Sequence, residues 1–203
     1  MVLKWIAAAV ESPRRKERLP TSAESHPANL LEAVPDRLHV DVVVDTSLSG
    51  EPDRVPPLTP LRVDGLVRPP YRAFPLPDHC ADKLCAIIET HEQAGEVRGS
   101  SRVKDLVDLA LIARTQHVDG SALRTAILSG TAHRHLPLPS SFSVPDLTSW
   151  SAGFAKTIAT APGEPMTFTD AVDLVGRFLN PALAGPITGT WDPHGSNWAT
   201  PTA

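Results

Sequence analysis

Two segments, PLPDHCADKLCAIIE at residues 75–89 and SSRVKDLVDLALIA at residues 100–113, carry the clearest structural pattern in the sequence. In the first segment, apolar residues recur at the i, i+3, i+4 and i+7 spacing that places them on one side of a helix. The second segment has positively and negatively charged residues close together at its start, and it then becomes apolar. We predict one helix over residues 79–93 and another from about residue 101 to 115, joined by a glycine-containing loop.

The segments around this pair indicate an α+β fold. Residues 37–45, RLHVDVVVD, form the best strand candidate, because alternate valines would share one face. Residues 46–59 read as a turn-rich loop, and short edge strands are expected within residues 60–68. A strand-containing segment followed by a helical one is typical of α+β proteins. Further helices are expected at residues 2–11, 120–129, 146–158 and 168–179, with Asp78 and Asp119 as N-caps and a surface tail from Pro181.

We accordingly divide the chain into a strand region at residues 1–77 and a helical domain with a Trp-rich tail at residues 78–203. A length of 203 residues fits one domain or slightly more. The 21 prolines and few aromatic residues predict long irregular connections around a modest core.

The composition excludes some functional classes. The formal net charge is −4, so no global basic field attracts nucleic acid, and any such contact must be local. No apolar run reaches the ~18 residues that a transmembrane helix requires, so we expect no membrane contact. Cys80 and Cys85 would point roughly 140° apart on one helix, which predicts reduced thiols in a cytoplasmic protein rather than a disulfide.

Lys83 is the first candidate functional residue. It falls at the margin of the apolar stripe of its helix, neither in the core nor fully towards water. A lysine in this position can reach a nucleotide phosphate as a point charge. The alternative is a lysine whose methylene groups cover apolar surface while its ammonium reaches water.

The second candidate site is the charged start of the following helix. Arg102, Lys104, Asp105 and Asp108 lie within seven residues and are neighbours at i,i+3 and i,i+4 spacings. Exposed ion pairs add only a few tenths of a kcal/mol, so stability alone gives little reason for the cluster. Such a cluster can hold a phosphate or a metal-bound nucleotide. The alternative is a solvated helix start, where acidic residues favour the helix dipole.

Asp41 and Asp45 are the candidate metal ligands, because carboxylates pointing off a strand suit the hard cation Mg²⁺. The alternative is a half-solvated strand with polar residues outward. Loop positions are expected for His133 and His135, and packing roles for Trp191 and Trp198. The sequence contains no GxxxxGK[ST], GxGxxG, GxSxG or HExxH motif.

Three segments resemble the AbiEii-type nucleotidyltransferase family, the toxins of type IV toxin–antitoxin systems. They are FPLPDHCADKLCAIIE, SSRVKDLVDLALIA and the late WDPHGSNW. The likeness spans about residues 37–198, is strongest at residues 74–113, and looks most like the actinobacterial branch of the family. It implies a partial nucleotidyltransferase-like sheet followed by a C-terminal helical bundle.

The resemblance also implies an activity and a set of site residues. Such enzymes use Mg²⁺ to move a nucleotide from an NTP to an acceptor, which is the tRNA 3′ end in characterised relatives, and they are controlled by a cognate antitoxin. By position, Asp41 would be a metal carboxylate, Lys83 would contact the triphosphate and Asp105 would be the functional acid. The flanking Arg102, Lys104 and Asp108 would bind the nucleotide.

One part of the family pattern is not found. The nucleotidyltransferase pattern begins with a Gly-Ser turn and a D-x-D strand that supply two metal carboxylates, and nothing in residues 1–36 fits it. We therefore expect that the chain begins inside the fold. An alternative function follows, a non-catalytic remnant that binds an antitoxin or a nucleotide. A further alternative is an unrelated helical interaction module.

Overall fold

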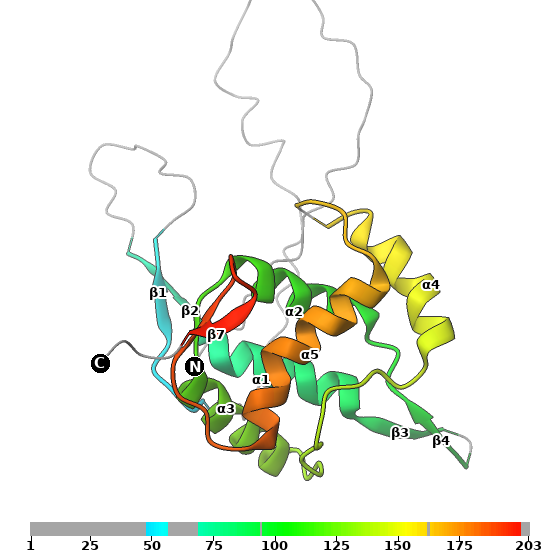
Figure 1. Ribbon diagram of the computed structural model, residues 1–203. Coiled ribbons are helices and arrows are strands. Elements are labelled where there is room, and N and C mark those ends of the chain that lie inside the picture. The colour runs from blue at the N-terminus through cyan, green and yellow to red at the C-terminus, as the bar shows by residue number, and fades with distance from the viewer. Residues whose placement is uncertain (1–47, 57–68, 94, 162, 200–203) are drawn as a thin grey trace, which may run out of the picture.

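A computed structural model describes residues 48–56, 69–93, 95–161 and 163–199 (Figure 1). In these ranges the chain forms a helical body with small antiparallel sheets at its edges, which confirms the α+β class. The helices are α1 (Leu76–Ile88), α2 (Val103–Thr115), α3 (Gly120–His133), α4 (Leu147–Ile158) and α5 (Phe168–Ala184).

The strands form two hairpins and one three-stranded sheet. The first hairpin pairs β1 (Asp53–Val55) with β2 (Tyr71–Ala73), and the second pairs β3 (Thr90–Gln93) with β4 (Glu96–Gly99). The sheet has the order β5-β6-β7, in which β5 (Val118–Asp119) connects α2 to α3. Its other strands, β6 (Thr190–Asp192) and β7 (Asn197–Ala199), come from the C-terminal part of the chain.

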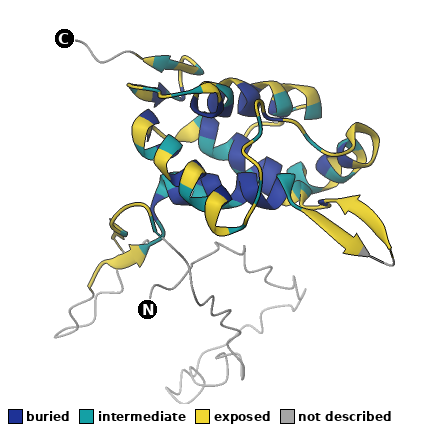
Figure 2. Ribbon diagram, turned by 90° about the horizontal axis from the view of Figure 1, so that it is seen from below, coloured by how far each residue is buried: buried dark blue, intermediate teal, exposed yellow. Residues whose placement is uncertain are grey.

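The core lies between the apolar faces of the helices (Figure 2). Helix α1 packs against α3 and α2, and α2 in turn packs against α5 and α4. Leu84 of α1, Leu109 of α2 and Phe178 of α5 are fully buried. The apolar spacing in residues 75–89 and 100–113 therefore produces the faces that meet in this core.

Helix α1 begins and ends earlier than predicted. The helix expected over residues 79–93 spans Leu76–Ile88, because prolines are tolerated in a first helical turn, where their missing N–H costs nothing. Asp78 is therefore not the N-cap. It lies in the first turn, where its carboxylate accepts hydrogen bonds from the Ser49 backbone N–H at 2.8 Å and from the Ser49 hydroxyl at 3.0 Å.

Residues 90–93 and 96–99, expected as the end of a helix and a loop, form the two strands of the β3–β4 hairpin. This hairpin projects from the body and is exposed along β4 (Figures 1 and 2). A second correction concerns residues 46–59, which contain strand β1 and are not wholly loop. In both places the strands are short and mostly exposed, so the sequence holds no alternation of buried and exposed residues to reveal them.

Two helices extend further than expected. Asp119 is the N-cap of helix α3, as predicted, and its side chain accepts a hydrogen bond from the Ala122 backbone N–H at 2.8 Å, but the helix runs to His133. His133 is therefore helical, while His135 follows the helix with a positive φ of 55°. Helix α5 continues to Ala184 with Pro181 inside it, so the tail begins later than expected.

The C-terminal segment packs through its tryptophans, as predicted. Trp191 is fully buried and donates from Nε1 to the carbonyl of Ala113 at 2.7 Å. Trp198 donates from Nε1 to the Phe178 carbonyl at 3.2 Å, and its ring stacks on Phe178 with a centroid distance of 5.9 Å. The two tryptophans therefore join β6 and β7 to α2 and α5.

Several predictions fall on other parts of the chain. The helix at residues 2–11, the strand at residues 37–45 with Asp41 and Asp45, and the edge strands within residues 60–68 lie outside the described residues. The division into residues 1–77 and 78–203 stays a prediction for the same reason. Within the described ranges, no helix is long and apolar enough to cross a membrane, and both cysteines are free and buried.

Candidate functional site

Helices α1 and α2 bring one lysine against two carboxylates. Lys83 lies on α1, and Asp105 and Asp108 lie one turn apart on α2. The Lys83 Nζ is 3.2 Å from Asp105 Oδ1 and 2.5 Å from Asp108 Oδ2. The side chains of Lys83 and Asp105 are only 6% and 7% exposed, whereas that of Asp108 is 27% exposed. The lysine therefore points into the contact between the two helices.

Asp105 connects the buried lysine to an outward-facing arginine. Its Oδ1 accepts from Lys83, while its Oδ2 accepts from the Nε of Arg102 at 2.9 Å. The side chain of Arg102 is 63% exposed, so only one edge of its guanidinium is fixed. One carboxylate thus fixes the position of two cations, and both of its oxygen atoms are used.

Lys83 and Arg102 each have N–H groups that donate to no described residue. An ammonium group has three N–H donors, and two of those of Lys83 point to Asp105 and Asp108. The Nη atoms of Arg102 donate to no residue in the described ranges. Lys104 is exposed at the same helix start and forms no ion pair with a described residue. The site therefore presents unused N–H donors of the kind that bind phosphate oxygens.

Charge balance explains how the cluster tolerates burial. Lys83 and Arg102 contribute two positive charges, and Asp105 and Asp108 contribute two negative charges. Removing an ion from water costs several kcal/mol, so buried charges persist only when they are paired and hydrogen-bonded. Cys80 lies one turn before Lys83, and burial raises the pKa of its thiol to about 12, although the nearby ammonium acts in the opposite direction. This thiol is therefore not a nucleophile at neutral pH.

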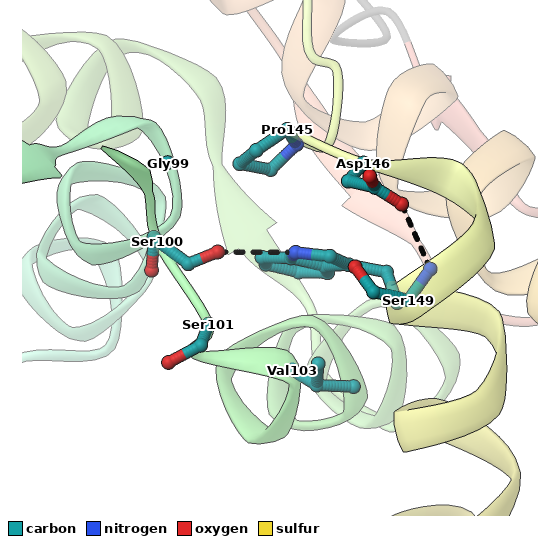
Figure 3. Close-up of a pocket in the computed structure, with 8 residues that line it drawn as sticks. Gly99, Ser100, Ser101, Val103, Pro145, Asp146 and Ser149 are labelled. Carbon is teal, nitrogen blue, oxygen red and sulfur yellow. Dashed lines mark hydrogen bonds between the residues drawn. The ribbon is translucent and has the colours of Figure 1, made fainter. Parts of the chain in front are cut away.

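A pocket of about 510 Å³ opens beside the start of α2 (Figure 3). Ser100 and Ser101 line one side of it, and Pro145 and Asp146 line another. The indole of Trp150, on α4, donates from Nε1 to the Ser100 carbonyl at 3.1 Å. This bond joins two residues that lie fifty positions apart in the sequence. Sequence reasoning did not identify this pocket, because no local pattern indicates that α4 meets the start of α2.

The predicted site residues are thus partly assembled. Lys83, Asp105, Asp108 and Arg102 form one connected cluster, and Lys104 lies beside them at the surface. Asp41 lies outside the described residues. The roles assigned to all of these side chains stay predictions.

The carboxylates of the cluster do not fit a divalent metal as they stand. In the described ranges, no group of three or more His, Cys, Asp or Glu side chains could hold a metal ion. Asp105 has both oxygen atoms engaged by cations, and Asp108 accepts from Lys83. A hard cation needs several free oxygen ligands, which this pair does not offer.

The comparison with protein families gives one match that covers most of the chain. Residues 3–174 match the model described as nucleotidyl transferase AbiEii toxin, type IV toxin–antitoxin system. No curated protein and no solved structure matches the chain. The family match includes the lysine helix, the charged helix start and α4, so all of the described cluster lies within it. The chain therefore belongs to the AbiEii family of nucleotidyltransferase toxins of type IV toxin–antitoxin systems.

Proposed function

We propose that this protein transfers a nucleotide from an NTP to RNA, with the tRNA 3′ end as the acceptor, in the cytoplasm, where both substrates occur. The observation that carries the proposal is the pairing of buried Lys83 with Asp105 and Asp108 beside the exposed guanidinium of Arg102. Exposed ion pairs contribute little to stability, whereas this arrangement is buried at one end and presents at the other end donors that no described residue accepts from. These properties suit a triphosphate-binding site and support the proposal.

Each residue has a distinct part in the proposed site. Lys83 and Arg102 contact the triphosphate, and exposed Lys104 adds positive charge beside it. Asp105 is a positioning residue, because both of its oxygen atoms hold the two cations. Asp108 balances the charge of Lys83 and is exposed enough to move when a phosphate oxygen arrives.

The proposed reaction is a displacement at the α-phosphorus of the NTP. The RNA 3′ oxygen forms a bond to the α-phosphorus, the bond from this atom to the bridging oxygen breaks, and pyrophosphate leaves. The hydroxyl proton passes to solvent. Fixed cations stabilise the negative charge that grows on the leaving pyrophosphate. The structure supports a role for Lys83 and Arg102 in this step, since Asp105 orients both before substrate binds.

Nucleotidyltransferases typically use a divalent metal ion, and we propose Mg²⁺ for this protein. The metal would neutralise phosphate charge and align the attack. Asp41 is the proposed ligand from the sequence, and it lies outside the described residues. The described carboxylates are engaged by Lys83 and Arg102, so we assign the metal to none of them.

The family also implies two partners, a nucleotide substrate and an antitoxin protein. The type of acceptor is the finer proposal, and it rests on the family resemblance of the segments at residues 74–113. The antitoxin would have to prevent either nucleotide binding or access of the RNA.

The test is transfer of label from each of the four α-³²P-labelled NTPs to total tRNA, with Mg²⁺ present. We expect incorporation by the full chain and a loss of about 10-fold or more for Arg102→Gln, the range expected when a charge-assisted hydrogen bond is removed. Arg98→Gln is the matched control, because Arg98 is exposed on β4 and its ion pair among the described residues is with Glu96. Equal incorporation by Arg102→Gln and Arg98→Gln would contradict the assigned site.

A second function, binding without transfer, is favoured by one observation. Both described carboxylates of the cluster are neutralised by cations, so neither is free to act on a metal or a proton. Equilibrium binding of a fluorescent ATP analogue separates the two functions. Binding that Arg102→Gln weakens, together with no incorporation of any NTP, would identify a nucleotide-binding protein that does not catalyse transfer.

A further inference from the structure

A second cavity, which the proposed chemistry does not use, lies on α5 beneath β7. We call it the α5 trough. It has a volume of about 640 Å³, within the range of small-ligand sites, and its floor includes Gly176. The residues that line the trough lie between positions 142 and 198 of the sequence. Most of them come after residue 174, where the family match ends. Figure 1 shows β7 lying beside α5 at this point.

The glycine on the floor opens the trough. Gly176 lies in the middle of α5, where glycine costs up to about 1 kcal/mol relative to alanine. A methyl group at this position would meet only the Asn180 Nδ2, at an ordinary contact distance of 3.5 Å. Packing therefore does not require glycine here. What the glycine provides is space above the helix.

Several polar groups around this space have no partner among the described residues. Asp173 and Arg177 lie four residues apart on the exposed side of α5, yet they form no ion pair with each other or with other described residues. Asn180 accepts a hydrogen bond from the Phe142 backbone N–H at 2.7 Å, which leaves its amide N–H groups without a described acceptor. Pro181 has no N–H to donate to the Arg177 carbonyl four residues earlier.

An aromatic wall completes the trough. Trp198 is half-buried, with one face stacked on Phe178 at an interplanar angle of 4°. Its indole N–H is satisfied by the Phe178 carbonyl, so its contribution to the trough is apolar ring surface. Aromatic rings of this kind stack on nucleobases and contribute about 1–3 kcal/mol per base.

We propose that the α5 trough binds one ribonucleotide of the acceptor RNA strand. The base stacks on Trp198, a phosphate pairs with Arg177, and Asp173 accepts a hydrogen bond from a ribose hydroxyl. Carboxylates bind ribose hydroxyls in other nucleotide sites, and the 2′-hydroxyl is the group by which proteins distinguish RNA from DNA. The proposal rests on the proposed function for its biological context, since it assigns where the acceptor docks.

The location suits such a role. Trp191 packs against Trp198 and bonds to the Ala113 carbonyl near the end of α2, whereas Asp105 lies near the start of that helix. A rise of 1.5 Å per residue separates Asp105 from Ala113 by about 12 Å along the helix axis. A strand of a few nucleotides is longer than this separation along α2.

The test measures binding of a short single-stranded RNA, its DNA counterpart and free AMP to the full chain without NTP. Tryptophan fluorescence and electrophoretic mobility are the readouts. We expect RNA to bind more tightly than DNA, with quenching of the fluorescence. Gly176→Leu, which fills the trough, and Arg177→Gln should each weaken RNA binding about 10-fold or more. Asp173→Asn should reduce the preference for RNA over DNA.

Three controls make the result decisive. Gly176→Ala adds one methyl group to the same position, Arg98→Gln removes the same charge from the distant hairpin, and thermal unfolding verifies that each variant is folded. Unchanged RNA binding by folded Gly176→Leu and Arg177→Gln would overturn the proposal. The binding test contains no NTP, so its result does not depend on nucleotide transfer. Trough-dependent RNA binding without transfer would contradict the proposed function alone. Transfer together with normal RNA binding by the trough variants would contradict the trough proposal alone.

Discussion

Replacing Lys83 with methionine tests the buried cluster most directly. The change keeps the length and the apolar stem of the side chain but removes the ammonium. It leaves Asp105 Oδ1 without its donor at 3.2 Å and Asp108 Oδ2 without its donor at 2.5 Å. Breaking a buried ion pair by removing one partner costs about 3–5 kcal/mol, because the other charge stays buried and uncompensated.

Two features of the site place the expected loss at the lower end of that range. Arg102 still holds Asp105 Oδ2, and the side chain of Asp108 is 27% exposed and can turn towards water. We expect Lys83→Met to lower the free energy of unfolding by about 3 kcal/mol, the lower limit for breaking a buried pair. In a chain of this size, that loss lowers the Tm by about 6–12 °C.

Urea unfolding followed by tryptophan fluorescence and circular dichroism measures this loss. Lys104→Met is the matched control, because Lys104 is exposed at the same helix start, and it should change stability by no more than about 0.5 kcal/mol. Adding Asp108→Asn to Lys83→Met removes one stranded charge and should restore part of the stability. Equal stabilities of the two lysine variants would refute the claim that Lys83 is buried and paired.

Three further predictions concern other parts of the fold. Gly99→Ala should destabilise the protein by about 1–3 kcal/mol in urea unfolding, because overpacking is costly and its methyl group would lie 2.5 Å from the rigid ring of Pro145. Asp119→Ala should cost about 1 kcal/mol at pH 7 through loss of the helix cap. The pKa of Asp119 lies below its usual 3.8, mainly because a backbone N–H three residues later donates to it. The difference between the two proteins should therefore be complete above pH 3.8 and disappear as the pH falls through the lowered pKa. Burial raises the pKa of Cys80 to about 12 and that of Cys85 to about 11, so iodoacetamide at pH 8 should label neither thiol until the chain is unfolded, as mass spectrometry would show.

The sequence predicts the parts of the fold whose signals are local. The apolar spacing of α1 and α2 and the Asp119 cap are such signals, and each appears in the structure. The crowded charges at the start of α2 also predict a site. Periodicity alone indicates that Lys83 borders a core, but it does not show that Asp105 and Asp108 on another helix lie opposite it.

Other features depend on contacts between distant segments. The β3–β4 hairpin has no buried face along β4, so nothing in its sequence distinguishes it from a loop. Pro181 argues against a helix, yet α5 passes through it because the surrounding residues pack into the core. The pocket beside the start of α2 and the α5 trough each combine residues from separate elements, and no spacing rule brings these together.

The pairing of β5 with β6 also bears on how the protein is made. Val118 is in register with Trp191, and the Trp191 ring is buried in the core against α2 and α5. During synthesis, α1, α2 and α3 leave the ribosome long before Trp191 is added. A chain that terminates after α5 would lack this ring and the edge that β5 requires. Products of premature termination should therefore stay susceptible to proteases, so that a cell removes them before they accumulate.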